Sequence, residues 1–188
     1  MALPTSNMAE IEKAIAQLLT ALGEDPKSER FAKTPHRVAK LYSDVMDGQF
    51  ATLTNMTAFK EDKFNGAVMV HHVPFYAMCA HHLLLFQGTF GLAYVPGEKV
   101  LGLSKLVRIF RHNCKRPTTQ EEITEKAVDL LMHVADAKGA MCYVRAEHTC
   151  MTLRGVKSPG SMTTTVAARG SFLEDAEARQ MFLDEARR

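Results

Sequence analysis

The sequence has little net charge, no long apolar run and no secretory start. Lys and Arg outnumber Asp and Glu by only 23 to 21, which gives a formal net charge of +2. Nothing in the overall charge therefore points to nucleic acid or an anionic membrane. No apolar run approaches the roughly 20 residues that span a bilayer. Residues 1–5 lack the basic start and apolar stretch of a signal peptide. We expect a cytoplasmic protein with neither a membrane nor a nucleic-acid partner.

Cysteine is scarce and is not arranged as a disulfide framework. The chain of 188 residues is long enough to build a full core, and its hydrophobic fraction of 46% is ordinary for a globular protein. It contains no C-x-x-C pair and four cysteines, Cys79, Cys114, Cys142 and Cys150. A closed structural zinc knuckle is therefore not indicated, and free thiols in a reducing compartment are the better interpretation.

The spacing of apolar residues predicts helices at the start of the chain and a mixture of strands and helices after it. Asn7 and Thr34 can cap two helices that end near Gly23 and Gly48, and residues 49–66 are expected to form a loop. Strands are then expected over 68–75, 84–92, 100–103, 140–150 and 162–168. Gly88 and Gly91 are candidate bulges. Helices are expected from the cap Ser104 to Pro117, from Thr119 to Gly139 and over 174–188.

The best metal ligands in the sequence lie in two short stretches. Cys79 and His82 have a C-x-x-H spacing, at which a turn or strand end lets two side chains hold one ion. His148 and Cys150 are two residues apart and would point to the same face of an extended strand. A Cys/Cys/His set suits zinc, and three protein ligands with one open position describe a catalytic site. Burial in the core is the alternative, since cysteine is often buried.

Two histidines in these stretches could transfer protons. His81 is adjacent to His82, and His148 is two residues from Cys150. An imidazole beside a metal moves protons near neutral pH, and zinc lowers the pKa of bound water to about 7. Together these are the parts of a hydrolase that acts on a carbon electrophile. A structural role is the alternative for His81.

A basic helix follows the first stretch. Its N-terminus, at Ser104, offers free backbone N–H groups to an anion, and Lys105 and Arg108 lie in its first turns. Arg154 follows Cys150 by four residues. These cations could bind a polyphosphate beside the metal, although a run of charge is more often a solvated face.

An amide and a carboxylate stand side by side at the start of the next helix. Gln120 and Glu121 could pair with the donors and the carbonyl of a guanine edge. Residues 119–122 also have the S/T-x-x-E form of a capping box, which needs no ligand. The residues alone favour the capping role.

Six motifs taken together closely resemble the GTP cyclohydrolase I family, in order from about residue 8 to 188. They are Thr34-Pro35-x-Arg37-Val38-Ala39-Lys40, Met78-Cys79-x-His81-His82, Gly102-Leu103-Ser104-Lys105-Leu106-x-Arg108-Ile109, Arg116-Pro117-x-x-Gln120-Glu121, Glu147-His148-x-Cys150 and Arg154-Gly155-Val156. The joint pattern is far more specific than any one fragment of it.

This resemblance implies a role for each matching residue. The zinc ligands would be Cys79, His82 and Cys150, and the proton-transfer residues His81 and His148. Ser104 would assist an Amadori rearrangement of the ribose. Gln120 and Glu121 would hold the guanine edge, and the triphosphate would be held by Arg37, Lys105, Arg108 and Arg154. Water activated by zinc would add to C8 of GTP, formate would leave, and the product would be 7,8-dihydroneopterin triphosphate, a precursor of folate and other pterins.

The resemblance also implies an architecture. The family has the α+β tunnelling fold, an antiparallel sheet with helices packed on one face, and its subunits form rings, commonly a decamer of two pentamers with active sites between subunits. Residues 1–66 would be an N-terminal helical segment and residues 67–188 the catalytic domain, together one functional unit. One position departs from the pattern: Ala80 stands where the family usually has Glu. A catalytically weakened member that binds GTP or a pterin is therefore the alternative.

Overall fold

The computed structural model describes residues 5–46, 53, 56–60, 64 and 66–188. The chain divides into two compact units, Met1–Thr52 and Leu53–Arg188. A catalytic domain that begins at residue 67 stays a prediction. In the described part of the chain, no helix combines the length and the apolar character that crossing a bilayer requires.

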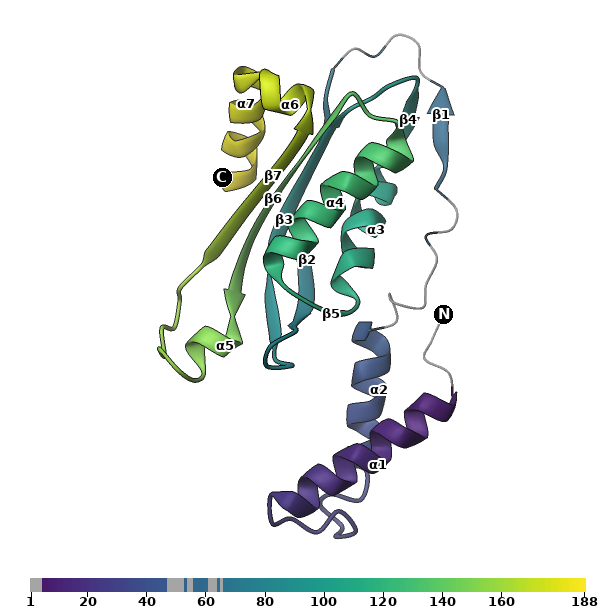
Figure 1. Ribbon diagram of the computed structural model, residues 1–188, viewed down its shortest axis with the longest axis vertical. Coiled ribbons are helices and arrows are strands. Elements are labelled where there is room, and N and C mark those ends of the chain that lie inside the picture. The colour runs from purple at the N-terminus through teal and green to yellow at the C-terminus, as the bar shows by residue number, and fades with distance from the viewer. Residues whose placement is uncertain (1–4, 47–52, 54–55, 61–63, 65) are drawn as a thin grey trace. The chain divides into compact units, whose positions relative to one another are not determined.

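The first unit contains two helices that pack on each other, as the apolar spacing predicted. They are α1 (Thr5–Ala21) and α2 (Thr34–Met46) (Figure 1). The helix α1 begins before the expected cap Asn7, and Gly23 follows its end with a φ of 85°. His36 Nδ1 lies 2.9 Å from Glu12 Oε1, so a hydrogen bond joins the two helices. The expected stop at Gly48 lies outside the described residues.

The second unit is built on a five-stranded sheet in the order β5-β2-β3-β6-β7. The strands are β2 (Val68–Cys79), β3 (Leu85–Val95), β5 (Pro117–Thr118), β6 (Gly139–His148) and β7 (Thr163–Gly170). All pairs are antiparallel except that of β2 with the short edge strand β5. A separate ribbon pairs β1 (Ala58–Lys60) with β4 (Lys99–Leu101). The expectation of a structureless loop was therefore wrong for β1.

Helices cover both faces of this sheet, not one face as the family resemblance implied. The helices α3 (Leu103–Cys114) and α4 (Gln120–Ala135) lie on one face, and α6 (Ser171–Glu174) and α7 (Ala176–Arg187) lie on the other (Figure 1). The larger core, between the sheet and α3 and α4, contains Phe75, Phe90 and Phe110. The smaller core contains Phe182 of α7 and Met141 and Tyr143 of β6, whereas Cys142 and Val144 of β6 lie in the larger core. Alternate residues of β6 therefore enter different cores.

A side chain caps the N-terminus of α4 but not that of α3. Gly102, not Ser104, precedes α3, and no side chain caps that helix, so Ser104 lies within its first turn. At α4 the predicted cap is confirmed, because Thr119 Oγ1 accepts a hydrogen bond from Glu122 N at 3.2 Å. The Glu122 carboxylate accepts from Thr118 Oγ1 at 2.9 Å instead of completing the capping box.

The irregularity in the long strands does not lie at the expected glycines. The register between β2 and β3 shifts between Val70 and Val73, where His72 has a φ of 56°. Gly88 keeps its place in the ladder for a different reason. A Cβ there would lie 2.0 Å from the Arg145 carbonyl oxygen, so only glycine allows β3 and β6 to approach this closely.

Leu106 and Leu103 on α3 provide a matched pair for testing where the core lies. The exposed fraction of Leu106 is 0% and that of Leu103 is 62%. Leu106→Ala should lower the free energy of unfolding by about 2–5 kcal/mol, because it leaves a cavity in the core. Leu103→Ala should change it by less than about 0.5 kcal/mol. Denaturant unfolding measures both, and equal effects would contradict this placement of the core.

Candidate metal centre and adjoining cavity

The two predicted halves of the metal site meet at one end of the sheet. Cys79 is the last residue of β2, and His82 lies in the turn that leads to β3. Because β3 pairs with both β2 and β6, the end of β6 lies beside this turn (Figure 1). The strand β6 ends at His148, and Cys150 lies in the following helical turn α5 (Thr149–Thr152). The prediction that His148 and Cys150 share a strand face was therefore wrong.

The ligand atoms of Cys79, His82 and Cys150 lie within 4.8 Å of one another. Cys79 Sγ is 3.7 Å from His82 Nδ1. Ligand atoms around a tetrahedral zinc ion lie roughly 3.5 Å apart, so small side-chain rotations would gather these three around one ion. Two sulfurs and one imidazole nitrogen also have the softness that zinc prefers. The residues therefore fit a metal with three protein ligands.

The electrostatics of the two cysteines agree with this fit. Burial raises the pKa of the Cys150 thiol above its ordinary value, and the neighbouring Cys79 raises it further. Two thiolates this close repel each other unless a cation lies between them. All four cysteines are free, but Cys114 and Cys142 are buried in the larger core. Of the four, Cys79 and Cys150 are the two that lie beside a histidine within ligand distance.

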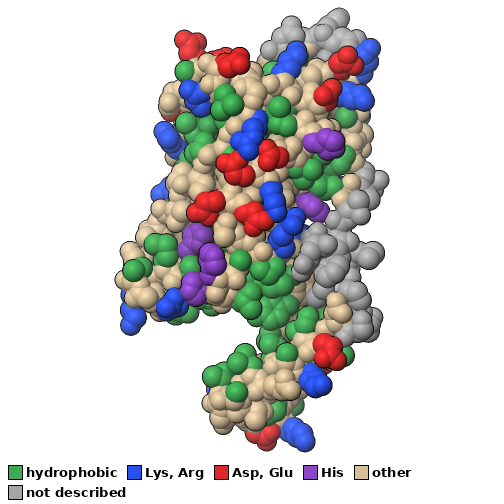
Figure 2. Space-filling view, in the orientation of Figure 1, with side chains coloured by type: hydrophobic (Ala, Val, Ile, Leu, Met, Phe, Trp, Pro, Cys, Tyr) green, Lys and Arg blue, Asp and Glu red, His purple; other side chains and the backbone are tan. Residues whose placement is uncertain are grey.

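A cavity of about 310 Å³ opens beside this group. Six predicted site residues line it: Cys79, His81, Gln120, Glu121, His148 and Cys150. The wall also includes residues that the sequence did not indicate as site residues, Phe86, Thr118, Thr119, Met151 and Thr163. Figure 2 shows histidine side chains gathered beside α5 at this end of the sheet.

His148 is held in a defined orientation in the wall of the cavity. Its ring stacks on the buried ring of Phe86, with centroids 4.4 Å apart and planes 10° apart. The two residues are paired across β3 and β6, so the sheet register brings the rings together. His148 Nε2 lies 2.7 Å from Gln120 Oε1. Burial lowers the pKa of His148, and the Glu121 carboxylate opposes this shift.

Gln120 and Glu121 are adjacent in sequence but lie in different environments. The side chain of Gln120 has an exposed fraction of 1%, and its amide nitrogen donates to acceptors on β6 and β7. Glu121 is exposed at the cavity. A substrate in this cavity could therefore reach the side chain of Glu121 but not the buried side chain of Gln120. Guanine binding by either residue stays a prediction.

The predicted anion-binding residues of the second unit are not gathered at the cavity. Ser104, Lys105 and Arg108 lie on α3 and do not line it; Lys105 has an exposed fraction of 9%. Arg37 is exposed on α2, in the other unit. Among the predicted cations of the second unit, only Arg154 contacts the metal group, because its Nη1 donates to His82 Nε2 at 2.9 Å.

Comparison with known proteins decides the family. The family model described as GTP cyclohydrolase I matches residues 11–187. The chain belongs to the GTP cyclohydrolase I family. A relative from Geobacillus kaustophilus, named GTP cyclohydrolase 1, is 46% identical over 94% of this chain and 95% of its own. One of the same name from Bacillus subtilis is 43% identical over 97% of each chain.

A solved structure of the archaeosine synthase QueF-Like in the apo form aligns with 57% of this chain and 97% of its own. The sequence identity is 14% and the TM-score is 0.48, a degree of similarity on which no assignment rests. The assignment to the GTP cyclohydrolase I family depends on the sequence matches alone.

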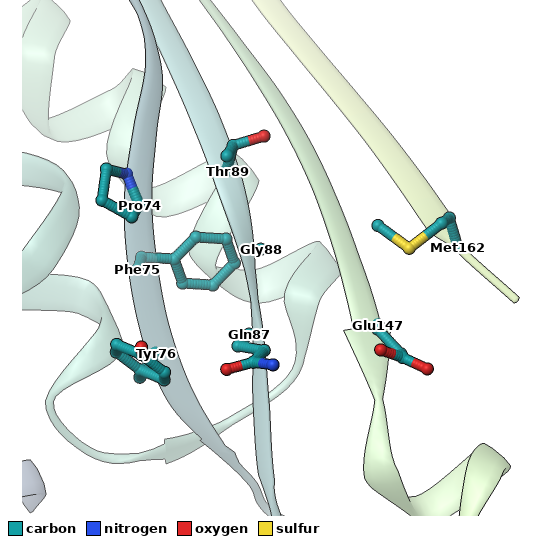
Figure 3. A pocket seen from close by; sticks show the side chains of 8 residues that line it. All are labelled: Pro74, Phe75, Tyr76, Gln87, Gly88, Thr89, Glu147 and Met162. Atoms are coloured by element: carbon teal, nitrogen blue, oxygen red, sulfur yellow. The ribbon is translucent and has the colours of Figure 1, made fainter. Parts of the chain in front are cut away.

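A second cavity of this GTP cyclohydrolase I family member contains none of the predicted site residues. It measures about 340 Å³ and lies on strands β2, β3 and β6 (Figure 3). Tyr76, Gln87 and Glu147 line it, on the face opposite to α3 and α4. Its wall lacks the cysteine and histidine donors of the first cavity, so the expected chemistry belongs to the first.

A change to one sulfur tests the metal site. Cys150→Ser should lower the zinc bound by the purified full chain from about one ion per chain to well below that, because a hydroxyl replaces one of three ligands. Cys142→Ala is the matched control, since Cys142 is buried away from the group and should not affect zinc content. Metal analysis of both purified proteins measures the zinc content. Equal zinc content in the two variants would contradict the assignment of Cys150 as a ligand.

Proposed function

We propose that this protein is a zinc-dependent GTP cyclohydrolase I that opens the imidazole ring of GTP at C8, releases formate and forms 7,8-dihydroneopterin triphosphate. The observation that carries this proposal is a metal-ligand group and two further histidines around one cavity, in a chain with relatives named GTP cyclohydrolase 1. This reaction is the first step of pterin and folate biosynthesis, and it would take place in the cytoplasm.

Cys79, His82 and Cys150 would hold the zinc ion. Zinc, when bound, supplies Lewis-acid activation of water. A neutral imidazole has a single lone pair, so His82 cannot bind a metal and also accept the hydrogen bond from Arg154. Arg154 would therefore turn away from His82 when zinc binds, and its guanidinium would be free for an anionic group of the substrate.

The two histidines would transfer the protons of the reaction. His148 and His81 both line the cavity, so either ring can reach a purine bound there. The lowered pKa of His148 favours the neutral ring near pH 7, which can accept a proton as water adds to C8. His81 would donate to or accept from a second position of the substrate, and Glu121 would accept from the guanine N–H groups.

The remaining substrate ligands are proposed to come from a neighbouring subunit. A triphosphate carries several negative charges, whereas only Arg154 among the predicted cations of the second unit contacts the metal group. Ser104, Lys105 and Arg108 at the start of α3 lie outside the cavity of their own chain. A ring of tunnelling-fold subunits, as in a decamer of two pentamers, would bring α3 of one copy to the cavity of another. Arg37 is proposed as a further phosphate ligand on the family resemblance alone.

A weakened member that binds GTP or a pterin is the second candidate, and Ala80 is the residue that favours it. Ala80 is exposed in the turn between the ligands Cys79 and His82. Formate release by the wild-type protein excludes this candidate. Binding of GTP without formate, together with formate release by Ala80→Glu, would establish it in place of the first.

GTP turnover and its dependence on His148 test the proposed function. The zinc-loaded protein should convert GTP to formate and to a pterin that fluoresces after oxidation. His148→Ala should lower kcat by about 10²–10⁴-fold, the usual contribution of a proton-transfer residue. Its zinc content should be unchanged, because His148 is outside the ligand group. No product from fully loaded wild-type protein would refute the activity.

Complementation between two inactive variants tests the shared site. Arg108→Ala and His148→Ala should each be nearly inactive, yet co-expression should recover roughly a quarter of wild-type activity if sites form between randomly mixed subunits. Co-expression of His148→Ala with Cys150→Ser is the control. Both of these residues line one chain's cavity, so no activity should return. If co-expression of the first pair recovers no activity, Arg108 either belongs to the site of its own chain or has no part in a site.

A further inference from the structure

Hydrogen bonds link Gln120 and Thr124 on α4 with Thr165 on β7, and the donor and acceptor of each bond can be assigned. Thr124 Oγ1 donates to the Gln120 backbone oxygen at 2.7 Å and lies 2.6 Å from Thr165 Oγ1. A hydroxyl has a single hydrogen, and that of Thr124 is used on a carbonyl oxygen that can only accept. Thr165 must therefore donate to Thr124. The Thr165 oxygen is then left to accept from Gln120 Nε2 at 3.1 Å.

Two more carbonyl groups fix the orientation of the Gln120 amide. Its nitrogen lies 3.3 Å from Val144 O and 3.1 Å from Thr163 O. Turning the amide over would place its oxygen against two carbonyl oxygens that can only accept, so both hydrogen bonds would be lost. The NH₂ group therefore faces β6 and β7, and Gln120 Oε1 faces His148.

This orientation decides which nitrogen of the His148 ring carries hydrogen. Gln120 Oε1 can only accept, so the contact of 2.7 Å with His148 Nε2 requires hydrogen on Nε2. The neutral ring then has its lone pair on Nδ1, for which no described residue provides a hydrogen-bond partner. Stacking on Phe86 fixes the plane of the same ring. We infer that Gln120 is a positioning residue that holds His148 as the Nε2–H tautomer and leaves Nδ1 to exchange protons with the substrate.

The inference deepens the proposed function and rests on it for the role of His148. If His148 accepts a proton at Nδ1 and later returns it, the Nε2–H bond to Gln120 stays in place throughout. The ring then needs neither rotation nor exchange of tautomers during turnover. This role differs from reading a guanine edge. Loss of a positioning group lowers kcat, whereas loss of a substrate contact raises KM.

The tautomer can be measured without any assay of activity. Solid-state NMR of the full-length zinc-loaded protein with ¹⁵N-labelled histidine separates ring nitrogens that carry hydrogen from those with a lone pair. The difference from labelled His148→Ala assigns the signals of His148. With the ring neutral, Nε2 should carry the hydrogen and Nδ1 the lone pair. The opposite tautomer, or a mixture of the two, would overturn the inference even if GTP turnover is normal.

Variants of Gln120 separate positioning from a structural role. Gln120→Leu should give a mixture of tautomers and lower kcat at least about 10-fold, with KM for GTP changed by less than about 3-fold and zinc content unchanged. Gln120→Glu is not a conservative variant here, because its second oxygen would face the Val144 and Thr163 carbonyl oxygens. Glu121→Gln is the neighbouring control and should leave the tautomer unchanged.

Three outcomes of the variants contradict the inference: retention of one tautomer in Gln120→Leu, an effect on KM alone, or loss of the tautomer in Glu121→Gln. If Gln120→Leu does not fold, the spectrum of the wild-type protein still decides. Failure of GTP turnover in the wild-type protein would refute the proposed function and leave the tautomer result standing. The two failures are therefore distinguishable.

Discussion

The pairing of β3 with both β2 and β6 is the constraint on which the rest of the site depends. It places Leu85 opposite Met78 and Phe86 opposite His148, so the ends of strands far apart in sequence meet. Side chains alternate between the faces of a strand, so a slip of one residue would turn His148 to the opposite face of the sheet. The glycine at position 88 supports this register, because any side chain there would collide with the Arg145 carbonyl.

The site lies where the apolar core gives way to polar groups. Along the face of β6 that α4 covers, Val144 and Ala146 are buried in the core and His148 is half-buried at the cavity. Gln120, at the start of α4, lies deeper than the histidine that it contacts. A buried amide is tolerated only when its hydrogen bonds are made, and β6 and β7 supply the acceptors. Satisfying this amide at the same time orients the imidazole.

Much of the fold could be predicted from the sequence, because periodicity and caps act locally. The helices of the first unit, the four long strands of the sheet and the Thr119 cap of α4 follow from patterns within a few residues, whereas the short edge strand β5 was not predicted. The strand β1 was missed because three residues without alternation give no signal, and its existence depends on pairing with β4. The covering of the second sheet face by α7 also depends on contacts between distant segments. Neither property is encoded in local spacing.

For the candidate site, the sequence by itself determined the chemical inventory: two thiols and a histidine suited to one metal, two more histidines, and the motifs of the family. It could not determine the geometry, because Cys79 and Cys150 are separated by 70 residues of strand and helix. Only the tertiary structure decided that Cys150 leaves the strand for a helical turn, that the α3 cations lie outside the cavity, and that Gln120 bonds to His148. The physical reason is that hydrogen-bond direction and burial are set by the neighbours that folding brings together.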